Sequence, residues 1–112
     1  MILRLLVAFA LLMAGCGTAK RSEPAAGPFT AGNAAQRNGQ VVFDRECSKC
    51  HTSGEAVLGP GINDKPLPEF LMRTQVRVGI GAMPGFTEQE ISDKELDDLM
   101  AYILALRKHG GS

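Results

Sequence analysis

The sequence predicts an all-α fold of three helices joined by loops, with no sheet. Three segments carry apolar residues at helical spacing together with residues that suit a helix start or end: 33–47, 68–78 and 92–109. No strand pattern precedes the cysteine motif at 47–51 or the glycine-rich segment at 79–85. With 112 residues, the chain is long enough for one domain at most.

The first helix is expected to begin at Asn33. This residue suits an N-cap, and Gln36 three positions later completes a pair that resembles a capping box. A glycine inside a helix costs up to ~1 kcal/mol relative to alanine. We therefore expect the glycine of this helix to allow close approach of another helix. Four residues share one helical face: Gly39, Val42, Phe43 and Cys47.

The second helix is expected to have Pro68 in its first turn, to run to about Val78 and to stop at Gly79. Arg73 and Arg77 are four residues apart and so lie on one face of this helix. A pair of this kind is most simply interpreted as a solvated surface pair, and that interpretation is favoured.

The last helix begins with a capping box, Ser92 to Glu95, and Gly110 is expected to stop it. Its charges match the helix dipole, with acidic residues at the start and basic residues at the end. The acidic run is interpreted as a solvated face. Five apolar residues follow at helical spacing: Leu96, Leu99, Met100, Ile103 and Leu106.

Charge and aromatic content narrow the possible functions. The chain has 12 basic and 12 acidic residues, so nothing indicates a nucleic-acid partner or an acidic substrate. Tryptophan is absent and only 5% of the residues are aromatic. A domain this small has difficulty building a core from its side chains alone. An additional apolar group in the interior would meet that need.

The segment CSKCH at 47–51 is the attachment pattern of c-type haem. Positions three apart on a helical turn share a face, so Cys47 and Cys50 can both form thioethers with the two vinyl groups of one porphyrin. His51 is then held beneath the iron as its proximal ligand. A covalently held haem would also supply the missing apolar group. The two arginines of the second helix could then face its propionates, which is the alternative to a surface pair.

Two other uses of the cysteine motif are less consistent with the sequence. A thioredoxin-like redox pair belongs at a strand-to-helix turn, and no strand pattern precedes Cys47. A zinc site needs about four nitrogen or sulfur ligands. Beyond Cys47, Cys50 and His51, only His109 remains as a histidine or cysteine ligand in the folded part.

Residues 1–15 are expected to be a signal peptide of the lipoprotein type. One basic residue is followed by an apolar run that is too short to span a bilayer but suits a signal peptide. The run ends in LMAGC (12–16), which resembles a bacterial lipobox whose cysteine, here Cys16, takes the lipid. Met13 departs from the Leu, Val or Ile usual at that position. The alternative is an ordinary secretory signal cut nearby.

Residues 16–32 are rich in Gly, Ala, Pro and Ser, and we interpret them as a flexible tether. Such a segment reaches roughly 20–25 Å, enough for a tethered domain to swing between partners at a membrane. The alternative is that it only spaces the folded domain, 33–110, from the lipid. The three cysteines are all used if Cys16 carries lipid and the other two carry haem, so no disulfide is needed.

Met83 is the candidate for the sixth ligand of the iron. A thioether is a soft ligand that favours Fe(II), and a Met/His pair raises the reduction potential of haem. Pro84 stiffens the neighbouring backbone, while Gly81 and Gly85 are expected to let it approach the porphyrin. Two other methionines lie in helical patterns and are expected in the core: Met72 and Met100.

The proximal histidine of a haem usually donates its other ring N–H to a fixed acceptor. The carbonyl of Pro60 is the candidate acceptor for His51, because proline is rigid and has no N–H of its own. The alternative is that Gly59-Pro60-Gly61 is only a turn.

The first helix, the CSKCH motif, the Gly-Pro turn, the Met-Pro pair and the last helix follow one another in a characteristic order. By that order, the chain from about Gly39 to Lys108 resembles a small bacterial monohaem class I cytochrome c. The resemblance implies a cytochrome c-like fold, with three helices and loops wrapped around one covalently bound haem c. It supports the roles given above to Pro60 and Met83. It also implies that the first helix crosses the last. The residues expected at that crossing are Gly39 and Phe43 against Leu99 and Tyr102.

The resemblance implies a one-electron carrier, not an enzyme, working with redox protein partners as donor and acceptor. Together with the lipobox-like segment, it places the protein in the periplasm as a membrane-anchored lipoprotein. Three alternatives stay open. A haem enzyme such as a peroxidase, or a haem-based sensor, would need an open or labile iron position at Met83. The third alternative is a haem subunit of a larger oxidoreductase complex.

Overall fold

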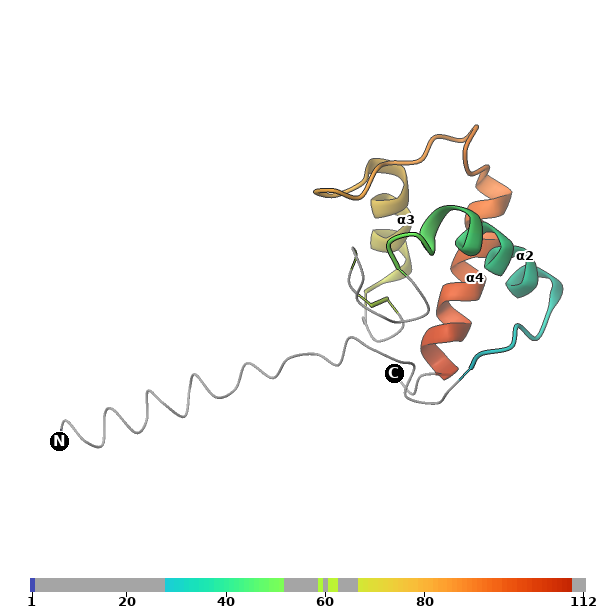
Figure 1. The fold of residues 1–112 in the computed structure, drawn as a ribbon, viewed down its shortest axis with the longest axis horizontal. Helices are drawn as coiled ribbons and strands as arrows, with labels where there is room; N and C mark the ends of the chain where they lie inside the picture. The colour runs from blue at the N-terminus through green and yellow to red at the C-terminus, as the bar shows by residue number, and fades with distance from the viewer. Residues whose placement is uncertain (2–27, 52–58, 60, 63–66, 110–112) are drawn as a thin grey trace.

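The computed structural model describes Met1 and residues 28–51, 59, 61–62 and 67–109. Within this part the fold is all-α, as predicted, and its only strand-like pairing is an isolated bridge between Ile80 and Met83. The elements in chain order are α2 (Ala34–Val42), the π-helix η1 (Phe43–Cys47), α3 (Glu69–Val78) and α4 (Asp93–His109). In Figure 1 the helix labelled α2 crosses the long last helix α4, and α3 lies alongside α4.

The start of α2 is capped as expected, with one difference. The Asn33 side chain accepts a hydrogen bond from the Gln36 backbone N–H at 2.9 Å. The Gln36 side chain accepts in turn from the backbone N–H of Gly32 at 2.8 Å, one residue before the cap. The two polar side chains therefore satisfy donors on both sides of the helix start.

The first helix does not stay α-helical up to the cysteine motif. Its last turn is the π-helix η1, in which the backbone N–H of Ser48 donates to the Phe43 carbonyl at 2.9 Å, five residues back. Residues four apart fall near one face in either kind of helix. Hydrophobic spacing could therefore predict that Phe43 and Cys47 share a face, but it could not reveal the wider turn.

The crossing of α2 and α4 is confirmed. A Cβ placed on Gly39 would lie 1.9 Å from the Asp98 carbonyl oxygen and 2.8 Å from the Tyr102 Cβ, so only glycine fits there. The rings of Phe43 and Tyr102 are tilted, with centroids 5.3 Å apart, and Leu99 is fully buried. The first helix is thus fixed against the last one just before the cysteine motif.

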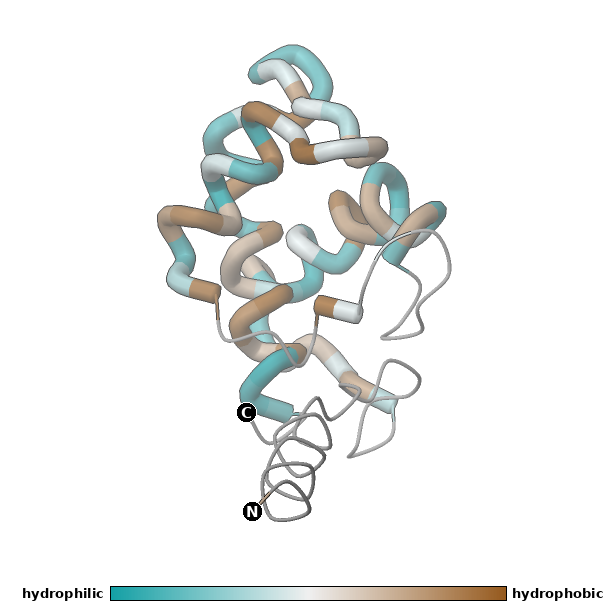
Figure 2. The backbone as a smooth tube through the Cα atoms, turned by 90° about the vertical axis from the view of Figure 1, so that its left-hand side faces the viewer, coloured by the Kyte–Doolittle hydropathy of each residue, from teal (hydrophilic) through white to brown (hydrophobic). Residues whose placement is uncertain are grey.

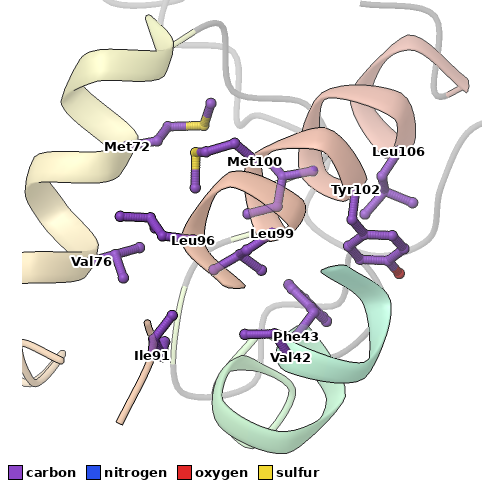
Figure 3. Close-up of a cluster of buried hydrophobic side chains, with 11 residues drawn as sticks. Val42, Phe43, Met72, Val76, Ile91, Leu96, Leu99, Met100, Tyr102 and Leu106 are labelled. Atoms are coloured by element: carbon purple, nitrogen blue, oxygen red, sulfur yellow. The ribbon is translucent and has the colours of Figure 1, made fainter. Parts of the chain in front are cut away.

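Helix α3 packs on α4 through Met72 and Val76, both buried. Figure 3 shows Met72 and Met100 pointing toward one another, which confirms both as core residues. Along the tube in Figure 2, hydrophobic and hydrophilic positions alternate, as expected of helices with one buried face. The buried apolar side chains form one cluster: Val42, Phe43, Met72, Val76, Ile91, Leu96, Leu99, Met100, Tyr102, Ile103 and Leu106.

The ends of the later helices agree with the sequence. Pro68 caps α3, and Gly79 ends it with φ of 75°, a left-handed value that favours glycine. At the start of α4, the Ser92 N–H donates to the Glu95 carboxylate at 2.9 Å, and the Glu95 N–H donates to the Ser92 hydroxyl at 3.1 Å. The expected stop at Gly110 lies outside the described residues.

The acidic run of α4 is not simply a solvated face. Asp98 is buried, with its carboxylate 2.7 Å from the Lys94 ammonium. The Ser92 backbone N–H, together with the guanidinium of an arginine, holds the pKa of Glu95 below its ordinary value. Three of the acidic residues pair with arginines on other elements: Asp93 with Arg77, Glu95 with Arg45 and Asp97 with Arg73.

The described fold also extends into the segment expected to be tether. Phe29 packs against the core, with its ring centroid 5.7 Å from that of Tyr102 and 5.4 Å from that of His109. The part of the chain that packs on α4 therefore reaches back at least to this residue. In the part of the chain that the structure describes, none of the helices has the length and apolar character needed to cross a membrane.

Candidate haem site

The cysteine motif forms a tight turn at the end of the π-helix. Cys47 is the last residue of η1, and its carbonyl accepts from the backbone N–H groups of Cys50 at 3.1 Å and His51 at 2.9 Å. All three side chains are half-buried. The turn thus gathers two thiols and an imidazole within one turn of backbone.

Both thiols are free, and Cys47 packs against the buried core. Burial, reinforced by the charge of Glu46, raises the pKa of the Cys47 thiol to about 12. A redox-active cysteine needs a lowered pKa, because the thiolate is the nucleophile. The environment of Cys47 is therefore the opposite of that in a thioredoxin-like pair.

The ring of His51 lies against Gly59. A Cβ placed on Gly59 would lie 2.4 Å from the His51 Cε1 and 2.7 Å from its Nδ1. The backbone N–H of Gly59 also donates to the Cys50 carbonyl at 2.8 Å. Glycine is needed here for a close approach that the sequence alone did not reveal. The proposed acceptor for this histidine, Pro60, lies outside the described residues.

Met83 sits in a tight hairpin after α3. The Ile80 and Met83 backbones exchange two hydrogen bonds, N–H of each to carbonyl of the other, both 3.0 Å. Gly81 takes φ of 57° in the turn, and a Cβ there would meet nothing within 4 Å. The role of Gly81 is therefore to supply the turn conformation. The Met83 side chain is partly buried against the core cluster that Cys47 also borders.

The backbone that follows Met83 folds back on the end of α3. A Cβ on Gly79 would lie 2.5 Å from the Met83 carbonyl oxygen, and one on Gly85 would lie 2.6 Å from the Arg77 carbonyl oxygen. The N–H of Phe86 donates to the carbonyl of Val76 at 2.8 Å. Gly85, expected to approach a porphyrin, instead approaches the backbone of α3.

The two arginines of α3 have protein partners. Arg73 pairs with the carboxylates of Glu69 at 2.8 Å and Asp97 at 2.7 Å. Arg77 pairs with Asp93 at 2.7 Å, and its guanidinium also donates to backbone carbonyls of the segment that follows Met83. Arg73 thus matches the surface-pair interpretation, whereas Arg77 is half-buried and bonded to backbone, so a solvated pair does not describe it.

The donor set suits a haem. The motif turn and the Met83 hairpin border one buried core, and imidazole and thioether are established axial ligands of haem iron. Among the residues that the structure describes, no group of three or more His, Cys, Asp or Glu is placed to hold a metal ion. The zinc alternative therefore has no ligand set within that part. Cys16, the expected lipid site, lies outside the described residues.

The fold and the donor set define a small helical protein that carries a covalent haem. Comparisons with known proteins agree with this class. The family described as "Cytochrome C oxidase, cbb3-type, subunit III" matches residues 34–103. The chain therefore belongs to the cytochrome c family. It carries covalently bound haem c and is a haem-based electron carrier.

Similar curated proteins include cytochrome c6 of Gloeothece citriformis, 33% identical over 91 residues, which cover 74% of this chain and 80% of that protein. Cytochrome c6 of a Synechocystis species is 31% identical over 75% of this chain and 79% of its own length. The cytochrome c subunit of 4-cresol dehydrogenase [hydroxylating] of Pseudomonas putida is 32% identical over 62% of this chain. That match spans only 60% of the subunit. No solved structure matches the chain significantly.

Proposed function

We propose that this chain carries single electrons with a haem held by thioethers at Cys47 and Cys50, with His51 and Met83 as the two axial ligands of its iron. The observation that carries the proposal is that the motif turn and the Met83 hairpin border the same buried cluster. Bound haem supplies the one-electron Fe(III)/Fe(II) couple.

The two cysteines hold the haem. Each thiol would be joined to one vinyl group by a sulfur–carbon bond, with the thiol hydrogen passing to the neighbouring vinyl carbon. The addition needs neither an oxidant nor a reductant. Because the Cys47 carbonyl accepts from the N–H groups of both Cys50 and His51, the two sulfurs and the imidazole stay within one turn.

His51 and Met83 define the iron's ligands. Packing of the imidazole against Gly59 limits where the ring can turn. The thioether of Met83 favours Fe(II) and raises the reduction potential. With this imidazole and this thioether both bound to the iron, no position would remain open for oxygen or peroxide. This arrangement supports electron transfer and disfavours an enzyme or a gas sensor.

Three exposed apolar side chains also offer surface that a porphyrin could cover. Phe70 is 66% exposed, Val78 73% and Ile80 64%, although all three are large and apolar. They lie on α3 and on the hairpin that carries Met83. Large apolar side chains left exposed on neighbouring elements are consistent with a surface that another apolar group covers.

We further propose that the carrier works at the periplasmic face of a membrane, anchored by a lipid on Cys16. The lipobox-like segment at 12–16 and the tether-like composition of the segment after it support this location. Its redox partners would be an electron donor and an electron acceptor at the same membrane.

A second candidate is a haem subunit of a larger oxidoreductase. The similarity to the cytochrome c subunit of 4-cresol dehydrogenase favours it. The two candidates differ in assembly, since a subunit would copurify with a second polypeptide at fixed stoichiometry and a free carrier would not.

The ferric visible spectrum of the purified holoprotein tests the ligand assignment. Wild type should show the weak, long-wavelength sulfur-to-iron charge-transfer band of methionine ligation, and Met83→Leu should lose it. Met72→Leu is the matched control, because Met72 is buried in the core and this swap of similar volume should cost under about 1.5 kcal/mol. Loss of the band in Met72→Leu, or its survival in Met83→Leu, would refute the assignment.

A further inference from the structure

The segment between Met83 and α4 is held by one side chain of α3. We propose that Arg77 is a positioning residue for Met83, keeping the hairpin and the segment 84–91 closed on α3 so that the thioether stays on the iron. The inference rests on the proposed ligation by Met83 and adds a residue to which neither the motif nor the family comparison gives a role.

The Arg77 guanidinium bonds to several separate parts of the chain. One terminal nitrogen of Arg77, Nη1, donates to the carbonyls of Phe86 at 3.2 Å, Thr87 at 3.3 Å and Ile91 at 2.7 Å. The other terminal nitrogen, Nη2, lies 2.7 Å from the Asp93 carboxylate at the start of α4. A single guanidinium thus joins the end of α3, the segment after Met83 and the beginning of α4.

Backbone contacts also hold the segment after Met83 against α3. The N–H of Phe86 donates to the Val76 carbonyl. Gly79 and Gly85 allow the backbone of residues 83–85 to contact the backbone at the end of α3. The far end of the segment is also fixed, because the side chain of Ile91 is fully buried. Moving residues 86–91 away from α3 therefore requires breaking the bonds to Arg77, and the Met83 hairpin leads directly into that stretch.

Arginine is suited to this task and lysine is not. Its planar guanidinium presents five donors in a fixed fork, whereas a lysine ammonium is a compact charge on a flexible stem. The Arg77 side chain is only 24% exposed, so its bonds are partly shielded from water. Hydrogen bonds that involve a charged group are stronger than neutral ones.

Arg73 offers a matched comparison on the same helix. It lies one turn earlier, and its side chain is 34% exposed. Its partners in the described structure are two carboxylates, Glu69 on α3 and Asp97 on α4. Removing Arg73 takes away an ion-paired arginine that joins α3 to α4, but it leaves the carbonyls after Met83 bonded to Arg77.

The test compares Arg77→Gln with Arg73→Gln in the ferric holoprotein, using imidazole as a ligand that binds iron only when Met83 has left. We expect Arg77→Gln to raise the rate of imidazole binding about tenfold or more, the effect of losing a hydrogen bond to a charged group. Its charge-transfer band should also weaken. Arg73→Gln should keep the band and bind imidazole at the wild-type rate, even if both variants lose similar stability to denaturant.

Equal imidazole rates in the two variants would overturn the role of Arg77. If Arg77→Gln does not fold, Arg77→Lys is compared with Arg73→Lys, and the same rule applies to that pair. A wild-type protein without the band would instead refute ligation by Met83. The failure of the proposed function is thus distinguishable from the failure of this inference.

Discussion

Gly39 in α2 lies so close to Asp98 in α4 that a Cβ on the glycine would stand 1.9 Å from the aspartate's carbonyl oxygen. This crossing brings Phe43, where the π-helix begins, onto the ring of Tyr102. The turn that carries the cysteine motif is therefore placed by the last helix. Arg45 adds a second link, since it donates to the Glu90 carbonyl at 3.2 Å and to the Glu95 carboxylate at 3.0 Å.

Because of this crossing, we predict that Gly39→Ala destabilises the fold. The new methyl group meets backbone atoms that cannot move aside, and overpacking of this kind costs about 1–3 kcal/mol or more in the free energy of unfolding. Gly32→Ala is the control, because a Cβ there meets only the end of a flexible side chain at 3.4 Å. Denaturant titration of both variants should show the loss in Gly39→Ala alone, and equal stability would contradict the crossing.

Gly59→Ala tests the packing of the proximal histidine. The added methyl would lie 2.4 Å from the His51 Cε1, so the ring must turn or the loop must shift. We expect a lower haem content per polypeptide, or a changed reduction potential in the protein that does mature. Haem absorbance measured against protein concentration gives the first quantity. A variant that matches wild type in both would show that the contact with Gly59 is not needed.

Covalent attachment through Cys47 and Cys50 predicts that haem stays on the polypeptide during denaturing electrophoresis. The double variant Cys47→Ala/Cys50→Ala should give no haem stain, because no thiol of the motif remains to form a thioether. Cys16→Ser should stain like wild type, since that cysteine lies outside the motif. Release of all the haem from wild type by acid–acetone extraction would disprove the attachment.

The lipid anchor is tested by fractionation of Cys16→Ser. If Cys16 carries the lipid, the variant should leave the membrane fraction and appear in the soluble periplasmic fraction, with its haem intact. Wild type should stay with the membrane after a high-salt wash, which removes proteins held only by charge. Identical distributions of the two proteins would exclude an anchor at Cys16.

The sequence predicted those features of the fold that depend on local patterns. Helix caps, hydrophobic spacing and the CSKCH motif involve residues a few positions apart. The glycine within the first helix indicated a close helix neighbour, and the family resemblance implied that this neighbour is the last helix. The arginine pairs could not be predicted in this way. Arg45 meets Glu95 across 50 positions and Arg77 meets Asp93 across 16, so these contacts exist only once the helices have packed.

Two further differences have the same origin. The contact of Gly59 with His51 depends on how the loop returns to the motif, and a glycine beside a proline indicates only a turn. Phe29 stands in a segment whose composition is that of a tether, yet its ring packs on Tyr102. Composition describes the average behaviour of a segment and does not reveal a single aromatic anchor within it.

The central claim is that His51 and Met83 close both axial positions of the iron. The measurement that tests it most directly is carbon monoxide binding to the ferrous holoprotein, followed by its visible spectrum. We predict slow or absent binding in wild type and fast, complete binding in Met83→Ala, whose reduction potential should also be lower. Fast and complete binding by the wild-type protein would contradict the claim and indicate a haem sensor or enzyme instead.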